Sequence, residues 1–230
     1  MPSHVPSPSV RVPPRGILIS LEGVDGSGKT TQARRLAAWL RAQGWPVQET
    51  REPGGTPLGA RLRKLILHPD ADSVPDRVTE LLLYLADRAQ HLATVIRPAL
   101  VRPAIVVADR YIDSTLAYQG AARKFGIAFL IALHRQLNLL HWPDWTVLLV
   151  IEPRVALQRK QAAKRGWSRF EQEDLAFHQA VAEGYAQLVR MFPERIYRVD
   201  GTLAPDRVFH DILNGLQQRF PWIRTEGTDL

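Results

Sequence analysis

The chain alternates between segments of strand length and longer amphipathic stretches. The predicted strands lie at about 16–22, 46–51, 104–108, 145–151 and 195–199. The segment 104–108 is apolar throughout, which is typical of a central strand covered on both faces. Because strands alternate with helices, the pattern predicts an α/β fold of three layers with a five-stranded parallel sheet. Right-handed crossovers then bring every loop from a strand to its helix to one edge of that sheet.

The stretches between these strands repeat apolar residues every three or four positions, which predicts helices. They span about 29–43, 57–67, 76–97, 113–120, 126–140, 172–191 and 204–219, with a further helix after Pro153. The helix at 76–97 carries two apolar stripes, which are Leu81, Leu85, Leu92 and Ile96, and Leu82, Ala86, Ala89 and Ala93. One stripe is enough to face a core, so the second predicts a homodimer formed through this helix.

The two ends of the chain differ from the part between them. Prolines among serines and valines predict that residues 1–15 are a disordered or extended lead-in. Residues 16–220 are expected to form a single domain, since a sheet of this type needs about 150 to 250 residues. Within that domain we expect a basic helical lid at about 159–172, and after it a frayed tail at 221–230.

Composition limits the chemistry that the chain can perform. The 230 residues include no cysteine, which excludes disulfides, thiolate metal sites and cysteine nucleophiles. The seven histidines form no cluster with ligand spacing, and His134 and His141 are expected to be structural. Apolar runs of about 18 residues and a signal-peptide pattern are both lacking, so no membrane partner and a cytoplasmic location are expected.

The formal net charge is +7, from 30 basic and 23 acidic residues. Arginines are scattered through predicted loops and helix ends rather than gathered with aromatic residues in one stripe, so no nucleic-acid partner is expected. An enzyme that brings two phosphorylated substrates together also needs local positive charge, and this explanation requires no further assumption.

The segment from Gly23 to Thr30 matches the phosphate-binding loop pattern G-x-x-x-x-G-K-[ST] and joins a predicted strand to a predicted helix. Glycines in such a loop let backbone N–H groups surround a phosphate, while the helix N-terminus adds partial positive charge. The lysine of the pattern, Lys29, would reach the β- and γ-phosphates, and the hydroxyl of Thr30 would bind Mg²⁺. The sequence therefore predicts a site for a nucleoside triphosphate.

A phosphate-binding loop identifies the phosphoryl donor and leaves the acceptor open. The base-reading N-K-x-D of switch GTPases is missing, and the strand at 104–108 ends in Asp109-Arg110 rather than in the two acids of a motor ATPase. An acid followed by a guanidinium fits a metal-side carboxylate beside a clamp for an acceptor phosphate. The loop at 51–57 follows a predicted strand, so it lies on the same edge of the sheet.

Taken together, these residues resemble the thymidylate kinase family over roughly 16–219. The matching motifs are Gly23 to Thr30, Arg51 to Thr56, Tyr84 with Arg88, Asp109-Arg110-Tyr111, Ser114 with Tyr118-Gln119-Gly120, and the basic segment ending in Arg169-Phe170-Glu171-Gln172-Glu173. The resemblance implies a P-loop kinase fold. It also implies transfer of the γ-phosphoryl group of ATP to dTMP, giving dTDP, with Mg²⁺ as cofactor.

The resemblance also assigns roles to residues. Those expected at ATP are Gly23, Gly26, Ser27, Gly28, Lys29, Thr30 and Thr31, with Thr30 and, through water, Asp109 at the metal. Those expected at dTMP are Asp25, Glu52, Pro53, Tyr84, Arg88, Arg110, Ser114, Tyr118 and Gln119. Tyr84 would stack on thymine, Arg88 would meet its polar edge, and Arg51 and Arg110 would hold the acceptor phosphate.

The family supplies its transition-state arginine either from the phosphate-binding loop or from the lid. Gly26 stands here at the loop position, so the resemblance assigns this role to the lid, where Arg159, Arg165 and Arg169 are the candidates. For several residues a purely structural role remains an alternative to a role at the site. Tyr84 could be a core tyrosine, Asp109 an ion-pair partner, and the lid arginines part of a solvated helix face.

The sequence alone leaves two other functions open. The first is a deoxynucleoside kinase or another nucleoside monophosphate kinase, which an acceptor screen would separate from a dTMP kinase. The second is a P-loop ATPase that acts as a switch on a macromolecular partner. Its sign would be ATP hydrolysis that is stimulated by that partner and indifferent to nucleoside monophosphates.

Overall fold

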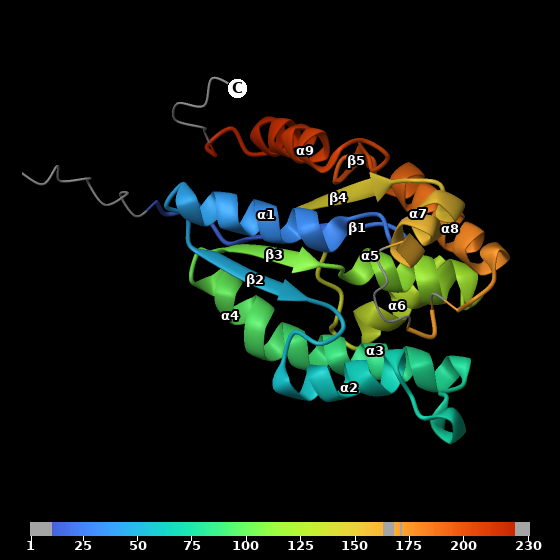
Figure 1. Cartoon of the computed structure of the whole chain (residues 1–230). Coiled ribbons are helices and arrows are strands. Elements are labelled where there is room, and N and C mark those ends of the chain that lie inside the picture. The colour runs from blue at the N-terminus through green and yellow to red at the C-terminus, as the bar shows by residue number, and fades with distance from the viewer. Residues whose placement is uncertain (1–10, 163–167, 171, 224–230) are drawn as a thin grey trace, which may run out of the picture.

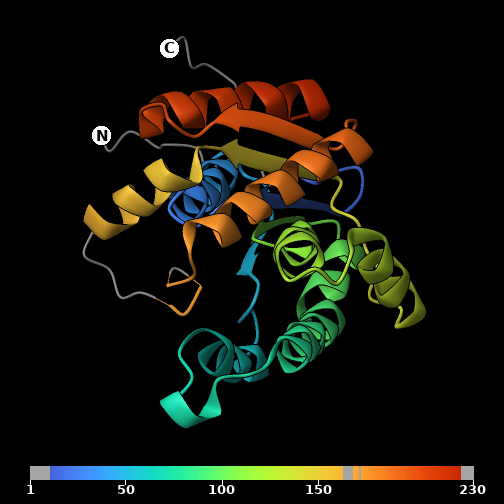
Figure 2. The same ribbon diagram turned by 90° about the vertical axis from the view of Figure 1, so that its right-hand side faces the viewer.

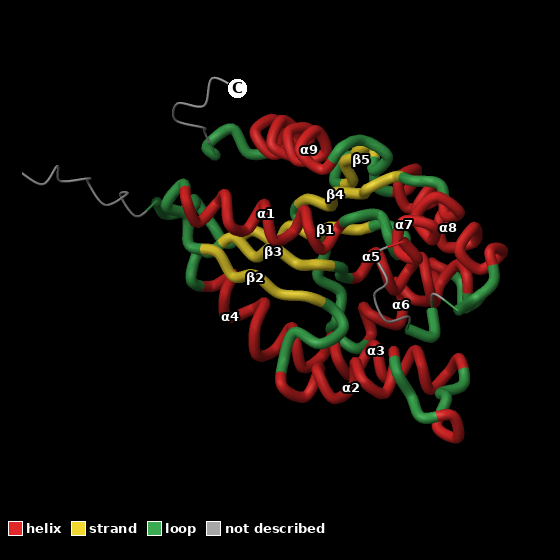
Figure 3. The backbone as a smooth tube through the Cα atoms, viewed as in Figure 1, coloured by secondary structure: helices red, strands yellow, loops and turns green. Residues whose placement is uncertain are grey.

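The computed structural model describes residues 11–162, 168–170 and 172–223. Its five strands form one parallel sheet in the order β2-β3-β1-β4-β5, which confirms the predicted fold class (Figures 1 and 3). They are β1 (Ile17–Glu22), β2 (Val47–Arg51), β3 (Ile105–Asp109), β4 (Trp145–Val150) and β5 (Ile196–Asp200). Since all strands run the same way, their carboxyl ends share one edge.

Helices cover both faces of this sheet. They are α1 (Lys29–Ala42), α2 (Pro57–Leu67), α3 (Arg77–His91), α4 (Arg97–Val101), α5 (Ile112–Thr115), α6 (Ile127–Gln136), α7 (Pro153–Ala162), α8 (Leu175–Met191) and α9 (Pro205–Arg219). Alternation along β1 separates two cores: Ile17, Ile19 and Leu21 pack with α1 and α9, whereas Leu18 packs with α3, α5, α6 and α8. β1 is buried along its whole length because of this double coverage.

Two helices differ from their predicted form. The helix expected at 76–97 consists of α3, a π-helical segment η2 (Leu92–Ile96) and α4, and it ends at Val101. Pro98 does not stop it, because the π-helical segment directly before this proline changes the hydrogen-bond pattern there, with Arg97 N bonded to Leu92 O. The helix expected at 113–120 is likewise α5 followed by a π-helical segment η3 (Leu116–Ala122).

The helix expected at 126–140 ends earlier, at Gln136. Beyond it Asn138 takes a left-handed conformation with φ 54°, and the Leu139 and Leu140 amides bond back to the His134 carbonyl. Asparagine tolerates this backbone region better than most residues do.

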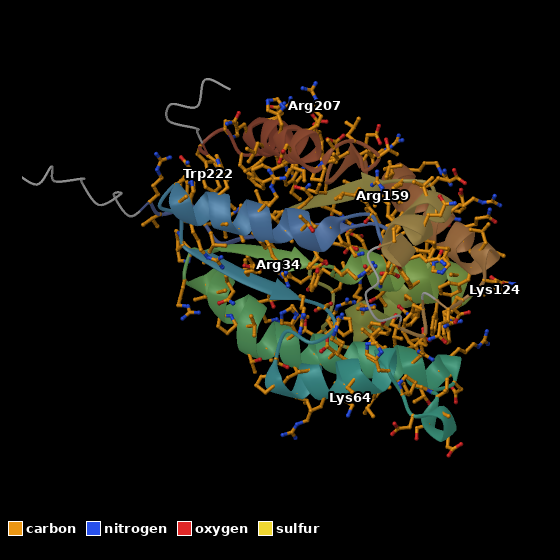
Figure 4. All side chains as sticks on the ribbon, viewed as in Figure 1. Arg34, Lys64, Lys124, Arg159, Arg207 and Trp222 are labelled. Carbon is orange, nitrogen blue, oxygen red and sulfur yellow. The ribbon has the colours of Figure 1, made fainter. Side chains whose placement is uncertain are left out.

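Both termini of the described chain lie on the face that carries α1 and α9. Ile223 is fully buried and Trp222 packs edge-on against Trp45 at 5.1 Å, so the described part of the expected tail is packed (Figure 4). Arg11 donates its amide to Gly44 O, and Arg15 pairs with Asp144. Most of the expected lead-in, and 224–230, fall outside the described residues.

Within the described chain, no helix combines the length and the apolar character needed to cross a membrane.

Candidate active site

A cavity of about 420 Å³ opens at the carboxyl edge of the sheet. Figure 2 looks toward this edge, where α7 and α8 lie on one side and α2 and α3 on the other. Predicted site residues that line the cavity are Asp25, Gly26, Gly28, Lys29, Thr30, Thr31, Arg51, Glu52, Pro53, Tyr84, Arg88, Asp109, Arg110, Ser114, Tyr118, Gln119 and Arg159. Gly23, Ser27 and Arg169 are not part of that lining.

The loop between β1 and α1 makes one end of the cavity. Gly26 and Gly28 have φ 84° and 95°, a backbone region that residues with a Cβ rarely adopt. A Cβ on Gly26 would lie 2.1 Å from the Ala156 carbonyl oxygen of α7, so the helix also excludes a side chain there. Gly28 precedes the first residue of α1 and has no side chain to cap it. The N–H groups of that first turn thus suit a phosphate.

Lys29 begins α1 and is 6 % exposed. Its Nζ lies 3.3 Å from Val24 O and 3.7 Å from Asp25 Oδ1. Burial and the Arg110 guanidinium lower the pKa of Lys29 to about 8. The ammonium is therefore still mostly protonated at neutral pH and can meet the negative charge of a nucleotide.

Asp109 ends β3 beside this loop. Its Oδ2 accepts a hydrogen bond of 2.6 Å from Thr30 Oγ1, while its Oδ1 is buried with no partner among the described residues. A hydroxyl and an acceptor oxygen with spare capacity fit a Mg²⁺ ion that keeps several waters and phosphate oxygens as ligands. Among the residues described, no group of three His, Cys, Asp or Glu side chains could hold a metal by itself.

Arg110 follows Asp109 with φ 68°, a strained value for a residue other than glycine. Its Nη1 donates to Gly23 O and Ser114 Oγ, both at 3.0 Å, and its Nη2 donates to Asp25 Oδ1 at 2.5 Å. The unusual backbone aims the guanidinium back across the phosphate-binding loop. We call Asp25, Lys29, Thr30, Asp109 and Arg110 the loop end of the cavity.

Asp25 is occupied by partners within the protein. Besides Arg110, Tyr118 donates its hydroxyl to Asp25 Oδ2 at 2.8 Å. Burial alone would raise the pKa of Asp25, but Arg110 and Lys29 outweigh it and hold that pKa well below its usual range. Asp25 is therefore a permanent carboxylate that orients Arg110, a role that the sequence did not indicate.

A buried carboxylate lies beneath Arg110. Glu22, the last residue of β1, accepts hydrogen bonds from Tyr111 N at 2.7 Å, Ser114 Oγ at 2.5 Å and Tyr185 Oη at 3.0 Å. Burial and the charge of Asp113 raise the pKa of Glu22 to about 7. Ser114 and Tyr185 both contact Arg110 in turn. The sequence offered no signal for Glu22 or Tyr185, because neither belongs to a recognisable motif.

At the other end of the cavity, α3 contributes Arg88, whose side chain is almost fully buried. Its Nε donates to Glu52 Oε2 at 3.0 Å, and its Nη1 lies 2.8 Å from His134 Nε2. Burial and Arg88 lower the pKa of His134 to about 4, so this histidine is neutral and accepts the bond. We call Tyr84, Arg88 and Gln119 the helix end of the cavity.

Glu52, which is expected at dTMP, is held by two partners within the protein. It lines the cavity but is 4 % exposed, and both of its oxygens are taken, one by Arg88 and the other by His91 Nδ1 at 2.8 Å. Its pKa is lowered, since Arg88 and His91 outweigh the effect of burial. Glu52 thus holds Arg88 in place, and a direct bond to a ligand would cost it a protein partner.

The three lid arginines separate in the structure. Arg159 lines the cavity, and its guanidinium donates to Gly201 O at 2.6 Å and Thr202 O at 2.7 Å (Figure 4). Arg165 lies outside the described residues. Arg169 binds the Glu80 carboxylate and Pro75 O on the α3 side, so its bonds direct it away from the phosphate-binding loop.

Several cavity residues were not among the predicted site residues. They are Arg63, Leu67, His68, Tyr111, Thr115, Lys160, Ser168 and Phe170. Lys160 belongs to the basic stretch of the sequence and could have been found there. Arg63 lies on α2 and donates to Pro53 O at 2.9 Å. Nothing in its sequence surroundings marks it as a site residue.

The parallel sheet has this strand order, a glycine loop precedes the N-terminus of α1, and Arg88 lines the same cavity. Together these features define a P-loop kinase fold. The family model for thymidylate kinase matches residues 21–212. The chain belongs to the thymidylate kinase family.

Named relatives agree with this assignment. The chain is 45 % identical to a thymidylate kinase of Deinococcus radiodurans over 206 residues, which cover 89 % of this chain and 98 % of the relative. It is 47 % identical to one of Thermomicrobium roseum over 190 residues, covering 83 % and 89 %. A crystal structure of thymidylate kinase from Ehrlichia chaffeensis superposes with a TM-score of 0.70 at 30 % identity, covering 89 % of this chain and all of that one.

Proposed function

We propose that this enzyme transfers the γ-phosphoryl group of ATP to dTMP and releases ADP and dTDP. The observation that carries the proposal is the single cavity that joins a phosphate-binding loop to a buried, oriented arginine on α3. An oxygen of the acceptor phosphate attacks the γ-phosphorus, and the bond from that phosphorus to the bridging oxygen breaks toward ADP. The second pKa of a phosphate is about 6, so the attacking group is already ionised at neutral pH.

At the loop end, positively charged side chains would offset the electrostatic repulsion between the two anionic substrates. Lys29, Arg51 and Arg110 line the cavity. Lys29 would pair with β- and γ-phosphate oxygens, and Arg51 and Arg110 would hold the acceptor phosphate. Asp25 keeps the Arg110 guanidinium directed across the loop before substrate arrives. Such preorganisation places positive charge without a rearrangement during the reaction.

We also propose that the reaction uses Mg²⁺ as its metal cofactor. Thr30 and, through water, Asp109 are the residues that would hold Mg²⁺. When bound, the ion neutralises charge on the β- and γ-phosphates. Of the two described lid arginines, only Arg159 lines the cavity, so it is the stronger candidate to contact the phosphoryl group during transfer. Arg165 remains a candidate from the sequence.

At the helix end, Tyr84 and Phe170 lie edge to face with ring centres 6.4 Å apart, and Tyr118 lies 5.9 Å from Phe170. These rings and Arg88 line the same cavity. Aromatic faces beside a polar edge suit a pyrimidine base. We assign the thymine ring to this end, with Tyr84 as its stacking surface.

The homodimer expected from the sequence is also proposed here. In the second stripe Leu82 is 58 % exposed, Ala86 and Ala93 are exposed as well, and Ala89 is half-buried. Val78, one turn before Leu82 on α3, is 49 % exposed. An apolar stripe of this kind suits a second copy of the helix. Sedimentation should show a dimer at micromolar concentration, and Leu82→Glu should shift it toward monomer, whereas a monomeric parent would contradict the proposal. A cytoplasmic location stays a prediction.

The test of the activity is ADP release from ATP and Mg²⁺ with dTMP, dUMP, dCMP and thymidine as acceptors. We expect the highest kcat/KM with dTMP. Faster turnover of thymidine or dCMP would favour another nucleotide kinase. ATP hydrolysis that ignores all four acceptors would contradict a kinase function of this site.

A further inference from the structure

A buried carboxylate stands behind the helix end of the cavity. Glu80, in the first turn of α3, is 1 % exposed and does not belong to the cavity lining. Its Oε1 accepts a hydrogen bond of 2.8 Å from Gln119 Nε2. Its Oε2 accepts from Arg169 Nη2 and lies 3.2 Å from Arg123 Nη2. Two guanidinium groups and one amide thus surround this carboxylate.

This arrangement decides which way the Gln119 amide points. A carboxylate accepts hydrogen bonds and donates none, so the amide must turn its NH₂ group toward Glu80. The amide oxygen then faces the other way. Gln119 lines the cavity, and none of the described residues donates a hydrogen bond to its Oε1. Gln119 therefore presents an acceptor to whatever the cavity binds.

Arg88, on the same cavity, presents the opposite polarity. A guanidinium carries five N–H groups and no acceptor. Glu52 takes the Nε and one Nη2 proton, and His134 takes one from Nη1. The two remaining N–H groups can donate to a ligand. The helix end thus offers an acceptor oxygen from Gln119 and donor N–H groups from Arg88.

This acceptor and donor match one kind of pyrimidine edge. Thymine and uracil carry a carbonyl oxygen at position 4 and an N–H at position 3, whereas cytosine carries an amino group and an unprotonated ring nitrogen there. A 4-keto pyrimidine can satisfy both protein groups at once. Cytosine would set its amino group against the Arg88 donor and its ring nitrogen against the Gln119 oxygen, and unpaired buried polar groups are costly.

We infer that Glu80 is a specificity-determining positioning residue, which selects 4-keto pyrimidine nucleotides by locking the amide of Gln119 with its oxygen toward the base. The inference rests on the proposed function and names the residue behind its base preference. Glu80 makes no contact with the base; it acts through Gln119, and its partners Arg123 and Arg169 hold it in place.

The test is Glu80→Gln, assayed for kcat/KM with dTMP, dUMP and dCMP. A glutamine at this position can donate as well as accept, so the Gln119 amide is no longer held in one orientation. We expect the dTMP to dCMP ratio to fall by about tenfold or more, which is the effect of one lost hydrogen-bond preference. The dTMP to dUMP ratio should stay within about twofold, since both bases present the same edge.

A matched control separates orientation from general damage. Arg123 Nη2 also pairs with Glu173 Oε1 at 2.5 Å. Glu173→Gln removes this second carboxylate partner of Arg123 and leaves Gln119 unchanged. This variant should keep the dTMP to dCMP ratio of the parent. A loss of discrimination in Glu173→Gln equal to that in Glu80→Gln would overturn the inference.

A double variant supplies the rescue. In Glu80→Gln with Gln119→Glu, the amide at 80 donates to a carboxylate at 119, which again presents an acceptor to the base. Discrimination against dCMP should return toward the parent value, as measured by dissociation constants if turnover is slow. Absence of rescue in a folded double variant, as judged by circular dichroism, contradicts the proposed orientation.

The outcomes distinguish this inference from the proposed function. A parent enzyme that fails to phosphorylate dTMP removes the proposed function itself. A parent that prefers dTMP, together with a Glu80→Gln variant that keeps the full preference over dCMP, leaves the function intact and overturns the role of Glu80.

Discussion

The loop end and the helix end of the cavity hold their charged groups in different ways. At the loop end, Asp25 and Arg110 neutralise each other, and Lys29 lies beside them. Most of these groups come from one loop and one strand end. At the helix end, Arg88 and Gln119 are each anchored from behind by a buried carboxylate, Glu52 and Glu80.

This difference corresponds to what each end has to recognise. Phosphates are multiply charged and rotate freely, so nearby cations and backbone donors can bind them in more than one orientation. A base presents fixed donors and acceptors at its edge, and its recognition requires each protein group to keep one orientation. We therefore expect damage at the loop end to reduce turnover, and damage at the helix end to change substrate affinity and choice.

The largest expected effect is that of Lys29→Ala at the loop end. Removal of the ammonium leaves the transferring phosphoryl group without its nearest buried cation, and kcat should fall by about 10³ or more. Steady-state ADP release measures this. Lys64→Ala is the matched control, because Lys64 is an exposed lysine of α2 that points away from the cavity (Figure 4). Equal activity of the two variants would contradict the assignment of Lys29.

The next largest effect is expected among the lid arginines. Arg159→Ala should lower kcat by about 10² to 10³, because an arginine at the transferring group stabilises charge in the transition state. Arg169→Ala should lower kcat by less than about tenfold, since Arg169 pairs with Glu80 at the helix end. Arg154→Ala, an exposed arginine on the same helix as Arg159, serves as control. If Arg159, Arg165 and Arg169 variants all keep the parent turnover, the lid does not supply the catalytic arginine.

A smaller effect, of a different kind, is expected for Glu52→Gln. The Arg88 guanidinium loses its charged partner and its orientation, so KM for dTMP should rise by about tenfold while kcat changes by less than about threefold. Initial rates over a range of dTMP concentrations separate the two constants. Glu183→Gln removes an exposed ion pair with Arg190 and should leave both unchanged. A fall in kcat with constant KM would place Glu52 in the chemical step instead.

The smallest effect is on stability and depends on pH. Glu22 has a pKa of about 7 in the folded protein against 4.5 when unfolded, so the folded state holds its proton more tightly. Stability from this group is present in full below about pH 4.5 and is lost as the pH rises toward 7. Urea unfolding of the parent and Glu22→Gln should show the parent losing free energy of unfolding relative to the variant over that range. A relative gain would contradict the raised pKa.

Much of the loop end could be predicted from neighbouring residues. The segment Gly23 to Thr30 carries its own chemistry, since the glycines set the backbone and Lys29 and Thr30 follow at once in the helix. The strand that ends at Asp109 is recognisable from its continuous apolar run. Local patterns report backbone conformation and the direction of burial, and these are sufficient to bring strand ends to one edge.

The partners of those residues could not be predicted in this way. Tyr185 reaches Glu22 across 163 positions of sequence, and Gln119 reaches Glu80 across 39. The sequence shows a glycine at position 26. Only the structure shows that a side chain there would collide with the Ala156 carbonyl.

The sequence by itself determined the order of elements, the phosphate-binding loop and the identity of the charged residues at each strand end. Only the tertiary structure decided which charges pair and which carboxylates are buried, among them Glu52 against Arg88 and Glu80 against Gln119. The physical reason is that helix and strand periodicity is encoded over a few residues. The orientation of a buried polar group depends on contacts from distant segments that meet only in the folded chain.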